Sequence, residues 1–240
     1  MTNGHRRLRI FGAGRRAQVI VDQLSWHFRE DYRLEGFYDD YKPAGALGPG
    51  GFPILGPIAQ GCAELRGDGI FAFLALGTYR SWRACEVLAV LQAQGVPFAR
   101  LVAPTAHVSP STVIGENALV MAGVFIGTEV AIGHLFTAHG GAAVEHQGQI
   151  GHNVLLGPAS TLAGLCRIED HCFLGIGTAV MPSVRIGAGT MTGAGSVVIA
   201  DLPPGVIAYG VPAEPRRLVG EGDEVPTPAI VDRLRPLFAE

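Results

Sequence analysis

The chain has 240 residues, is 48% hydrophobic and carries a formal net charge of −3. This length allows two domains, the absence of an 18-residue apolar run excludes a membrane span, and the acidic balance argues against nonspecific nucleic-acid binding. The N-terminal residues run directly into a strand and a glycine turn, without the pattern of a signal peptide, so we expect a cytoplasmic protein. Four cysteines show no close metal pair, and we expect Cys166 and Cys172 to be reduced core residues.

Residues 1–102 are expected to form an α/β domain. LRIFGAG predicts a strand with a glycine turn, AQVIVDQLSWHF a helix, RLEGFYDD and GIFAFLALG two more strands, and YRSWRACEVLAVLQAQG a second helix. The order βαβ…βα is typical of a small doubly wound parallel sheet.

Ligands of such sheets bind at the carboxyl ends of the strands. The residues predicted there are Gly12, Gly14, Asp39, Asp40 and Gly77. The turn opens a helix and carries Arg15 and Arg16, so its N–H groups and guanidinium groups suit a phosphate or pyrophosphate. Either aspartate can accept from a ribose or a base, although a purely structural glycine turn stays an alternative. The 27 residues from Gly12 to Asp39 exceed the roughly 20 typical of nicotinamide sites.

The next segment repeats with a period of six. From Val108 to Val198 an aliphatic or small residue recurs at sixteen successive sixth positions, and fourteen of these are Val, Ile or Leu. Helices need a period near 3.6 and strands a period of 2, so period six indicates a hexapeptide β-helix. Three hexads close one triangular turn, and residues 18 apart stack at about 4.8 Å. Glycines following the aliphatic residue are expected to supply tight corner geometry where a Cβ would clash.

The coil holds few charged residues, which makes Glu145-His146-Gln147 notable. This stretch follows the weakest hexad, at Ala138, where small residues leave room beside the coil. The register places His146 at the third position of its hexad, pointing outward. A neutral imidazole there can take a proton from an amine or a hydroxyl; an ordinary surface histidine is the alternative. His139 is a candidate lining residue of the same pocket.

His134, His152 and Asp170 are 18 residues apart and stack on one corner. Three ligands in line make a poor tetrahedron, so we favour a polar ladder and expect no metal. Residues 219–240 are predicted to form a loop and a short helix that either covers the open end of the coil or is frayed.

The chain to about residue 217 resembles the bacterial nucleotide-sugar N-acetyltransferases and their relatives, the sialic acid O-acetyltransferases. The resemblance rests on IFGAGRRAQVIVD, GFYDD, ALGTYRSWR, LVAPTAHVSPSTVIGENALVMAGVFIG, AAVEHQGQIG and IADLPPGVIAYGVPAEP. It implies a left-handed parallel β-helix of about five turns over residues 103–218. It also implies a homotrimer with active sites between coils, acetyl-CoA as the acyl donor, and a nucleotide-linked amino sugar held by residues 1–102.

The same resemblance assigns roles to single residues. It places the catalytic base at His146, beside Glu145 and Gln147, and matches the substrate turn to Gly14, Arg15 and Arg16. The acidic pair and Gly77 would contact the nucleotide-sugar. The positions that contact the acyl donor fall near Leu155, Ile176 and Ala194.

Three departures from the family pattern stand out. Gln147 replaces the usual acid, and its amide oxygen can orient the imidazole but brings no charge. Leu155 replaces a frequent histidine, and Arg15-Arg16-Ala17 replaces most of a histidine-containing glycine turn. The resemblance, together with the outward His146, implies an N-acetyltransferase acting on a nucleotide-linked 4-amino sugar. The alternatives are a sugar or sialic acid O-acetyltransferase, whose weaker nucleophile needs the base more, and a non-catalytic trimeric scaffold that binds a ligand.

Overall fold

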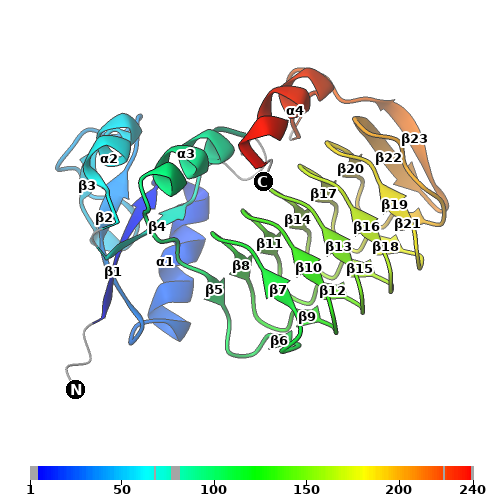
Figure 1. The fold of residues 1–240 in the computed structure, drawn as a ribbon, viewed down its shortest axis with the longest axis horizontal. Coiled ribbons are helices and arrows are strands. Elements are labelled where there is room, and N and C mark those ends of the chain that lie inside the picture. The colour runs from blue at the N-terminus through cyan, green and yellow to red at the C-terminus, as the bar shows by residue number, and fades with distance from the viewer. Residues whose placement is uncertain (1–4, 68, 77–81, 224, 239–240) are drawn as a thin grey trace. The chain divides into compact units, whose positions relative to one another are not determined.

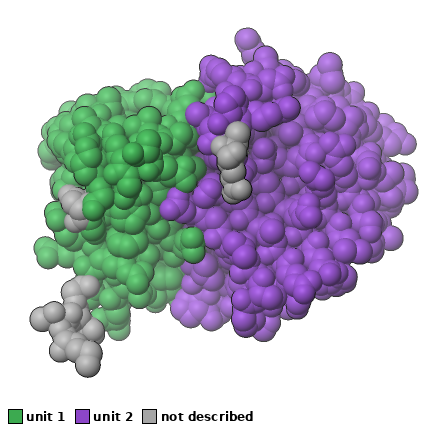
Figure 2. Space-filling model, viewed as in Figure 1, with its two compact units in different colours: residues 1–101 green, residues 102–240 purple. Residues whose placement is uncertain are grey.

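The computed structural model describes residues 5–67, 69–76, 82–223 and 225–238. The chain divides into two compact units, residues 1–101 and 102–240, which Figure 2 shows in green and purple. Residues 219–240, predicted to form a loop and a short helix, belong to the second unit.

The first unit is built on a four-stranded parallel sheet with the order β3-β2-β1-β4 (Figure 1). The strands are β1 (Arg6–Phe11), β2 (Tyr32–Tyr38), β3 (Ile54–Gly56) and β4 (Ile70–Leu74), and the helices are α1 (Arg15–His27), α2 (Ile58–Glu64), α3 (Trp82–Ala93) and the 3-10 turn η1 (Pro49–Gly51). Leu8, Ile10, Phe37 and Phe73 are fully buried in its core. The chain first extends the sheet on the β2 side of β1 and then returns to place β4 on the other side. This reversal is the point where ligands of doubly wound sheets bind.

Two elements of this unit, β3 and α2, were missed by sequence reasoning. The segment that contains β3 and ends directly before α2 reads PAGALGPGGFPILGP, and its glycines and prolines are typical of loops. The strand is only three residues long and pairs with β2 at the sheet edge, with an irregular register between Phe37 and Tyr38. An edge strand this short has too few residues to show an alternating pattern.

The second unit is a left-handed parallel β-helix with three faces, built mainly of two-residue strands. The β13 face consists of β7 (Val113–Ile114), β10 (Ala131–Ile132), β13 (Gln149–Ile150), β16 (Arg167–Ile168) and β19 (Arg185–Ile186). The β12 face consists of β6 (His107–Val108), β9 (Phe125–Ile126), β12 (Ala143–Val144), β15 (Thr161–Leu162), β18 (Ala179–Val180) and β21 (Val197–Val198). The β14 face consists of β5 (Leu101–Val102), β8 (Leu119–Val120), β11 (Thr137–Ala138), β14 (Leu155–Leu156), β17 (Phe173–Leu174), β20 (Met191–Thr192), β22 (Val206–Gly210) and the antiparallel β23 (Ala213–Leu218).

The predicted register is confirmed. Strands pair with the strand 18 residues on, as in Ala131 with Gln149 and Ile132 with Ile150. The second residue of each two-residue strand points inward, and Ile126, Val144 and Leu162 are fully buried. At the polar exception, Thr192, the hydroxyl lies 2.9 Å from the Thr178 hydroxyl and accepts from the Gly175 N–H, so the buried oxygen is satisfied.

The glycines that follow the aliphatic residue lie where a Cβ would clash, as expected. A Cβ at Gly115 would lie 2.6 Å from the carbonyl carbon of Gly133 in the next turn, so this glycine permits the close approach of two turns. The left-handed corner conformation falls at other positions and is often carried by larger residues, including Glu129 at φ 56° and Gln147 at φ 57°. The corners therefore present polar side chains in a conformation that usually favours glycine.

The C-terminal segment lies along the coil. It forms α4 (Pro228–Leu234) and the 3-10 turn η2 (Arg235–Phe238). A Cβ at Gly189 would lie 3.0 Å from the side chain of Val231, and the Phe238 ring stacks on His152 with 4.2 Å between ring centroids. The segment thus packs on the side of the coil, beside the corner between the β13 and β14 faces, and not over its open end. Among the described residues, no helix is long and apolar enough to cross a membrane.

Candidate functional site

The candidate base lies at the corner that joins the β12 face to the β13 face, which we call the His146 corner. The chain leaves β12 at Val144 and enters β13 at Gln149, and Glu145, His146 and Gln147 between them are all exposed. Two backbone hydrogen bonds fix this corner: Gln147 N–H donates to the Thr128 carbonyl at 2.7 Å, and Leu165 N–H donates to the His146 carbonyl at 3.0 Å. The outward position predicted for His146 is therefore observed on a rigid support.

A chain of side-chain contacts starts at the imidazole. Nδ1 of His146 lies 3.4 Å from Oε1 of Gln147, and Nε2 of Gln147 donates to Oε2 of Glu129 at 3.0 Å. Gln147 and Glu129 are 18 residues apart and both occupy left-handed corner positions, so they are direct neighbours on successive turns. Sequence reasoning missed Glu129, although its 18-residue separation from Gln147 was a usable signal.

The imidazole rests on Gly164, which lies one turn further along the coil from His146. A Cβ at Gly164 would lie 2.5 Å from Cε1 of His146 and would also overlap its Nε2. Since no real Cβ makes such contacts, the ring keeps its position only above a glycine. Gly164 was also missed by sequence reasoning.

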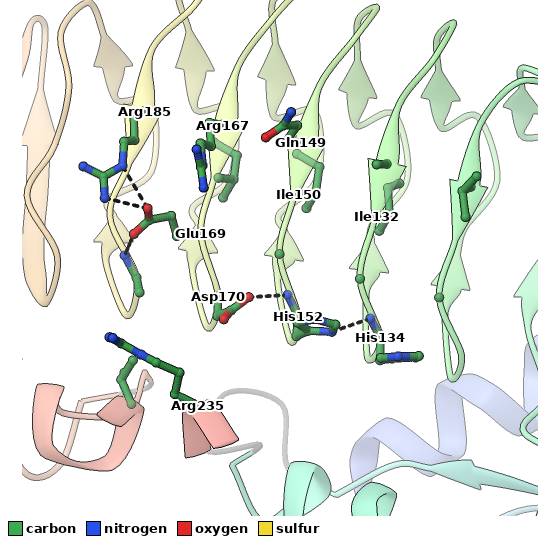
Figure 3. A pocket seen from close by; sticks show the side chains of 18 residues that line it. Ile132, His134, Gln149, Ile150, His152, Arg167, Glu169, Asp170, Arg185 and Arg235 are labelled. Atoms are coloured by element: carbon green, nitrogen blue, oxygen red, sulfur yellow. Dashed lines mark hydrogen bonds and ion pairs between the residues drawn. The ribbon is translucent and has the colours of Figure 1, made fainter. Parts of the chain in front are cut away.

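A groove with a volume of about 760 Å³ lies on the β13 face (Figure 3). Its floor includes the outward residues of successive strands, among them Gln149, Arg167 and Arg185. Arg185 donates to Glu169 at 2.6 and 2.8 Å, and Arg235 approaches from the C-terminal segment. Within the described part of the chain, the Arg167 guanidinium makes no hydrogen bond or ion pair. The groove is therefore bordered by cationic groups, one of them uncompensated.

One edge of this groove is the corner between the β13 and β14 faces, which we call the Asp170 corner. The predicted polar ladder lies there. The Glu116 N–H donates to Nδ1 of His134 at 3.0 Å, the His134 N–H to Nδ1 of His152 at 3.0 Å, and the His152 N–H to Asp170 at 2.7 Å. Each side chain therefore satisfies the backbone of the preceding turn. Over residues 5–67, 69–76, 82–223 and 225–238, no three His, Cys, Asp or Glu side chains are grouped so as to hold a metal ion.

His171, which directly follows Asp170 of the ladder, is expected to make the stability of the protein depend on pH. Burial lowers the pKa of His171 from 6.5 to about 4, an effect partly opposed by Asp170, and only 2% of the residue is exposed. The unfolded chain therefore binds a proton between pH 6.5 and 4 that the folded chain does not, so the free energy of unfolding falls as the pH falls through this window, by up to about 3 kcal/mol.

We expect His171→Asn, which retains a side chain suited to the left-handed conformation, to remove most of this pH dependence. Urea unfolding at pH 7 and pH 4.5, at one protein concentration, measures it. Equal losses of stability in the two proteins would contradict the assignment to His171.

In the first unit, the glycine turn after β1 meets the ends of β2 and β4. A Cβ at Gly12, where φ is 94°, would lie 2.9 Å from the Ala75 carbonyl oxygen. Asp39 accepts from the N–H groups of Ala13, Tyr41 and Lys42 at 2.7, 2.9 and 3.1 Å, and it is only 9% exposed. Asp39, expected to bind a ribose or base, thus uses its carboxylate to shape the turn.

The other residues predicted for this site have mixed surroundings. Asp40 accepts from the Ile58 N–H at 2.9 Å and forms an ion pair with Arg83. Arg15 is exposed, and Arg16 is half-buried at the start of α1, where burial lowers the pKa of its guanidinium to about 10. Gly14 is the N-cap of α1, and a Cβ at this position would meet no atom within 4 Å. Gly77 lies outside the described residues.

Lys42 is a cation at this turn that sequence reasoning did not select. Its Nζ donates to the Ala13 carbonyl oxygen at 2.8 Å. The contact places an ammonium group beside the N-terminus of α1, where the free N–H groups already favour an anion. The turn is therefore more cationic than Arg15 and Arg16 alone imply.

The positions expected to contact the acyl donor do not all lie together. Ile176, which is 59% exposed, and Ala194 stack at a third corner, between the β14 and β12 faces, which we call the Ile176 corner. Leu155 is buried on the β14 face. His139 directly follows β11 and so belongs to the Ile176 corner, while His146 follows β12. Within one chain the two histidines therefore lie at opposite edges of the β12 face and do not line one pocket.

Comparisons with known proteins agree with this architecture. The family model described as bacterial transferase hexapeptide (six repeats) matches residues 165–200. The structure of PerB from Caulobacter crescentus, in complex with CoA and GDP-perosamine, is 35% identical, covers 89% of this chain and 98% of its own, and has a TM-score of 0.77. The acetyltransferase domain of PglB from Neisseria gonorrhoeae, in complex with acetyl coenzyme A, is 27% identical, with coverages of 89% and 100% and a TM-score of 0.78.

Among curated relatives, the acyl-[acyl-carrier-protein]–UDP-N-acetylglucosamine O-acyltransferase of Burkholderia orbicola is 34% identical over 46% of this chain and 36% of its own length. The match to such relatives thus spans less than half of their length. The stacked hexads, the hexapeptide match and these structures define a hexapeptide-repeat acyltransferase. The near full-length similarity to PerB is more specific, and the chain belongs to the family that comprises the bacterial nucleotide-sugar N-acetyltransferases and the sialic acid O-acetyltransferases.

Proposed function

We propose that this protein transfers the acetyl group of acetyl-CoA to the amine of a nucleotide-linked amino sugar, with His146 as the general base. The observation that carries the proposal is the exposed imidazole of His146, supported on Gly164 with Nε2 directed away from Gln147. Support also comes from PerB, which was crystallised with CoA and GDP-perosamine, including variants in which one histidine is replaced by asparagine or alanine.

The proposed reaction uses this geometry. The sugar amine attacks the thioester carbonyl, Nε2 of His146 takes the amine proton, and the C–S bond breaks as the C–N bond is completed. The departing CoA thiolate takes up a proton. Backbone N–H groups of a neighbouring coil stabilise the oxyanion. A general base in this role contributes roughly 10²- to 10⁴-fold to the rate.

The first unit is proposed to hold the nucleotide. The N-terminus of α1, with Gly14, Arg15 and Arg16, favours the binding of an anion. Lys42 adds a further positive charge at this turn. Because Asp39 and Asp40 already accept from backbone N–H groups, phosphate recognition by the turn is the main contribution proposed here.

We also propose a homotrimer. Ile176 and Ala194, the proposed donor contacts, lie at one edge of the β12 face, and His146 lies at the other edge. A thioester bound along the Ile176 corner of one chain therefore needs the His146 corner of a neighbouring copy. Three copies arranged by cyclic symmetry provide three such junctions.

Ligand binding and turnover test the proposed function together. We expect acetyl-CoA and the correct nucleotide-linked 4-amino sugar each to raise the melting temperature, since a ligand at 100 times its Kd stabilises the native state by about 2.7 kcal/mol. The panel holds GDP-, UDP- and dTDP-linked amino sugars, with the free nucleotides as controls. Release of the CoA thiol then measures transfer.

The same assay distinguishes the alternatives. Preferential acetylation of a hydroxyl acceptor, presented in competition with the amines, would replace the proposal by an O-acetyltransferase. Absence of both transfer and acetyl-CoA binding, measured by calorimetry, would leave a ligand-binding scaffold.

A further inference from the structure

The contact between Gln147 and Glu129 fixes which end of the Gln147 amide faces the base. Carboxylate oxygens accept hydrogen bonds and do not donate them, so the group of Gln147 that lies 3.0 Å from Oε2 of Glu129 must be its NH2. The amide oxygen then points the other way, toward Nδ1 of His146 at 3.4 Å. Without Glu129, nothing in this pair of side chains would distinguish the two ends of the amide.

The orientation of the amide in turn fixes the imidazole tautomer. An amide oxygen only accepts, so Nδ1 of His146 must carry the proton to make this contact. The neutral ring then has its lone pair on Nε2, the nitrogen that lies above Gly164 and faces away from Gln147. A base with its proton on Nε2 could not accept a proton from a substrate at that position.

We propose that Glu129 is a positioning residue that acts through Gln147 to hold His146 in the tautomer protonated on Nδ1. This inference rests on the proposed function for its catalytic consequence. Glu129 supplies from the preceding turn the carboxylate that Gln147 lacks, and it does so because residues 18 apart are neighbours at the same corner. Two titratable side chains lie near His146. Glu145 precedes it directly in the chain, and Glu129 is connected to its ring through Gln147.

The tautomer can be measured without substrate. In protein labelled with ¹⁵N-histidine at pH 8, the His146 signals are identified by their loss in His146→Ala, and their nitrogen shifts distinguish Nδ1–H from Nε2–H. We expect the wild-type ring to be mainly Nδ1–H. In Glu129→Gln the new amide can donate as well as accept, so Gln147 loses its fixed orientation and the two tautomers mix. The kcat for acetyl transfer is expected to fall roughly 10-fold at unchanged KM.

An exchange of the two side chains provides the decisive control. In the double variant Glu129→Gln/Gln147→Glu, a carboxylate next to His146 accepts directly from Nδ1–H, so both the tautomer and kcat should return toward wild type. Gln147→Glu alone places two carboxylates side by side, and its kcat and its fraction of the Nδ1–H tautomer should be lower than those of the double variant. Glu116→Gln, which removes a carboxylate from a different corner of the coil, should change neither measurement.

The outcomes separate this inference from the proposed function. A wild-type ring protonated on Nε2, or a tautomer that Glu129→Gln does not change, would overturn the role of Glu129 whatever the activity. A tautomer that shifts while transfer is unaffected in both Glu129→Gln and His146→Ala would support the positioning and overturn His146 as the base.

Discussion

Replacement of His146 by alanine is expected to lower kcat for acetyl transfer by about 10²- to 10⁴-fold. The variant keeps the corner, because the backbone hydrogen bonds of Gln147 to Thr128 and of Leu165 to the His146 carbonyl do not involve the imidazole. The acceptor amine must then lose its proton to water. Since the ring takes part mainly in the transition state, KM for both substrates should change little.

Steady-state release of CoA, with the acceptor identified in the ligand panel, measures this loss. His107→Ala is the matched control, because His107 is also an exposed histidine on the coil and stacks on Phe125 one turn away. Unchanged turnover in His146→Ala would exclude this residue as the base. An equal loss in both variants would indicate damage to the coil instead.

Substitution of Gly164 by alanine should have the second largest effect, a loss of about 10²-fold in kcat with the fold intact. The added methyl group would overlap Nε2 and Cε1 of His146, and the imidazole is the exposed end of a side chain that can swing away. A displacement of about 1 Å at a reacting group is sufficient for a loss of this size.

The double variant His146→Ala/Gly164→Ala tests this explanation. If Gly164 acts only by supporting the ring, the alanine at position 164 costs little once the ring is gone, and the two effects are strongly non-additive. Additive losses would show that Gly164 matters for another reason, such as substrate access. Thermal unfolding of each variant checks that the coil remains stable.

The core of the coil was predictable from the sequence because its period is imposed by burial. Every inward position recurs at the sixth residue, and Ala138 and Thr192, the two exceptions to the aliphatic pattern, are nevertheless fully buried. The first unit was predicted less completely. Its segment from Pro43 to Glu64 lacks a usable period, and β3 is stabilised by pairing with β2 and not by local preference.

The candidate site could be predicted in position but not in detail. The register predicted the outward direction of His146, but it could not show that the ring leans over Gly164 or that Gln147 turns its amide toward Glu129. These outcomes depend on side-chain torsions, which a repeat pattern does not specify. Likewise, Asp39 follows a strand as a ligand-binding acid would, and only the structure shows three backbone N–H groups on its carboxylate.

Residues 18 apart are neighbours on successive turns of the coil, and this affects how such sequences diverge. At the corner that holds Glu129 and Gln147, Ser111 lies one turn before Glu129 and accepts from the Glu129 N–H at 2.9 Å. A function lost by substitution on one turn can therefore be recovered by a substitution 18 residues away, with no change of backbone. In a set of homologous sequences, acids at the two positions should be anticorrelated, one of them appearing where the other is absent.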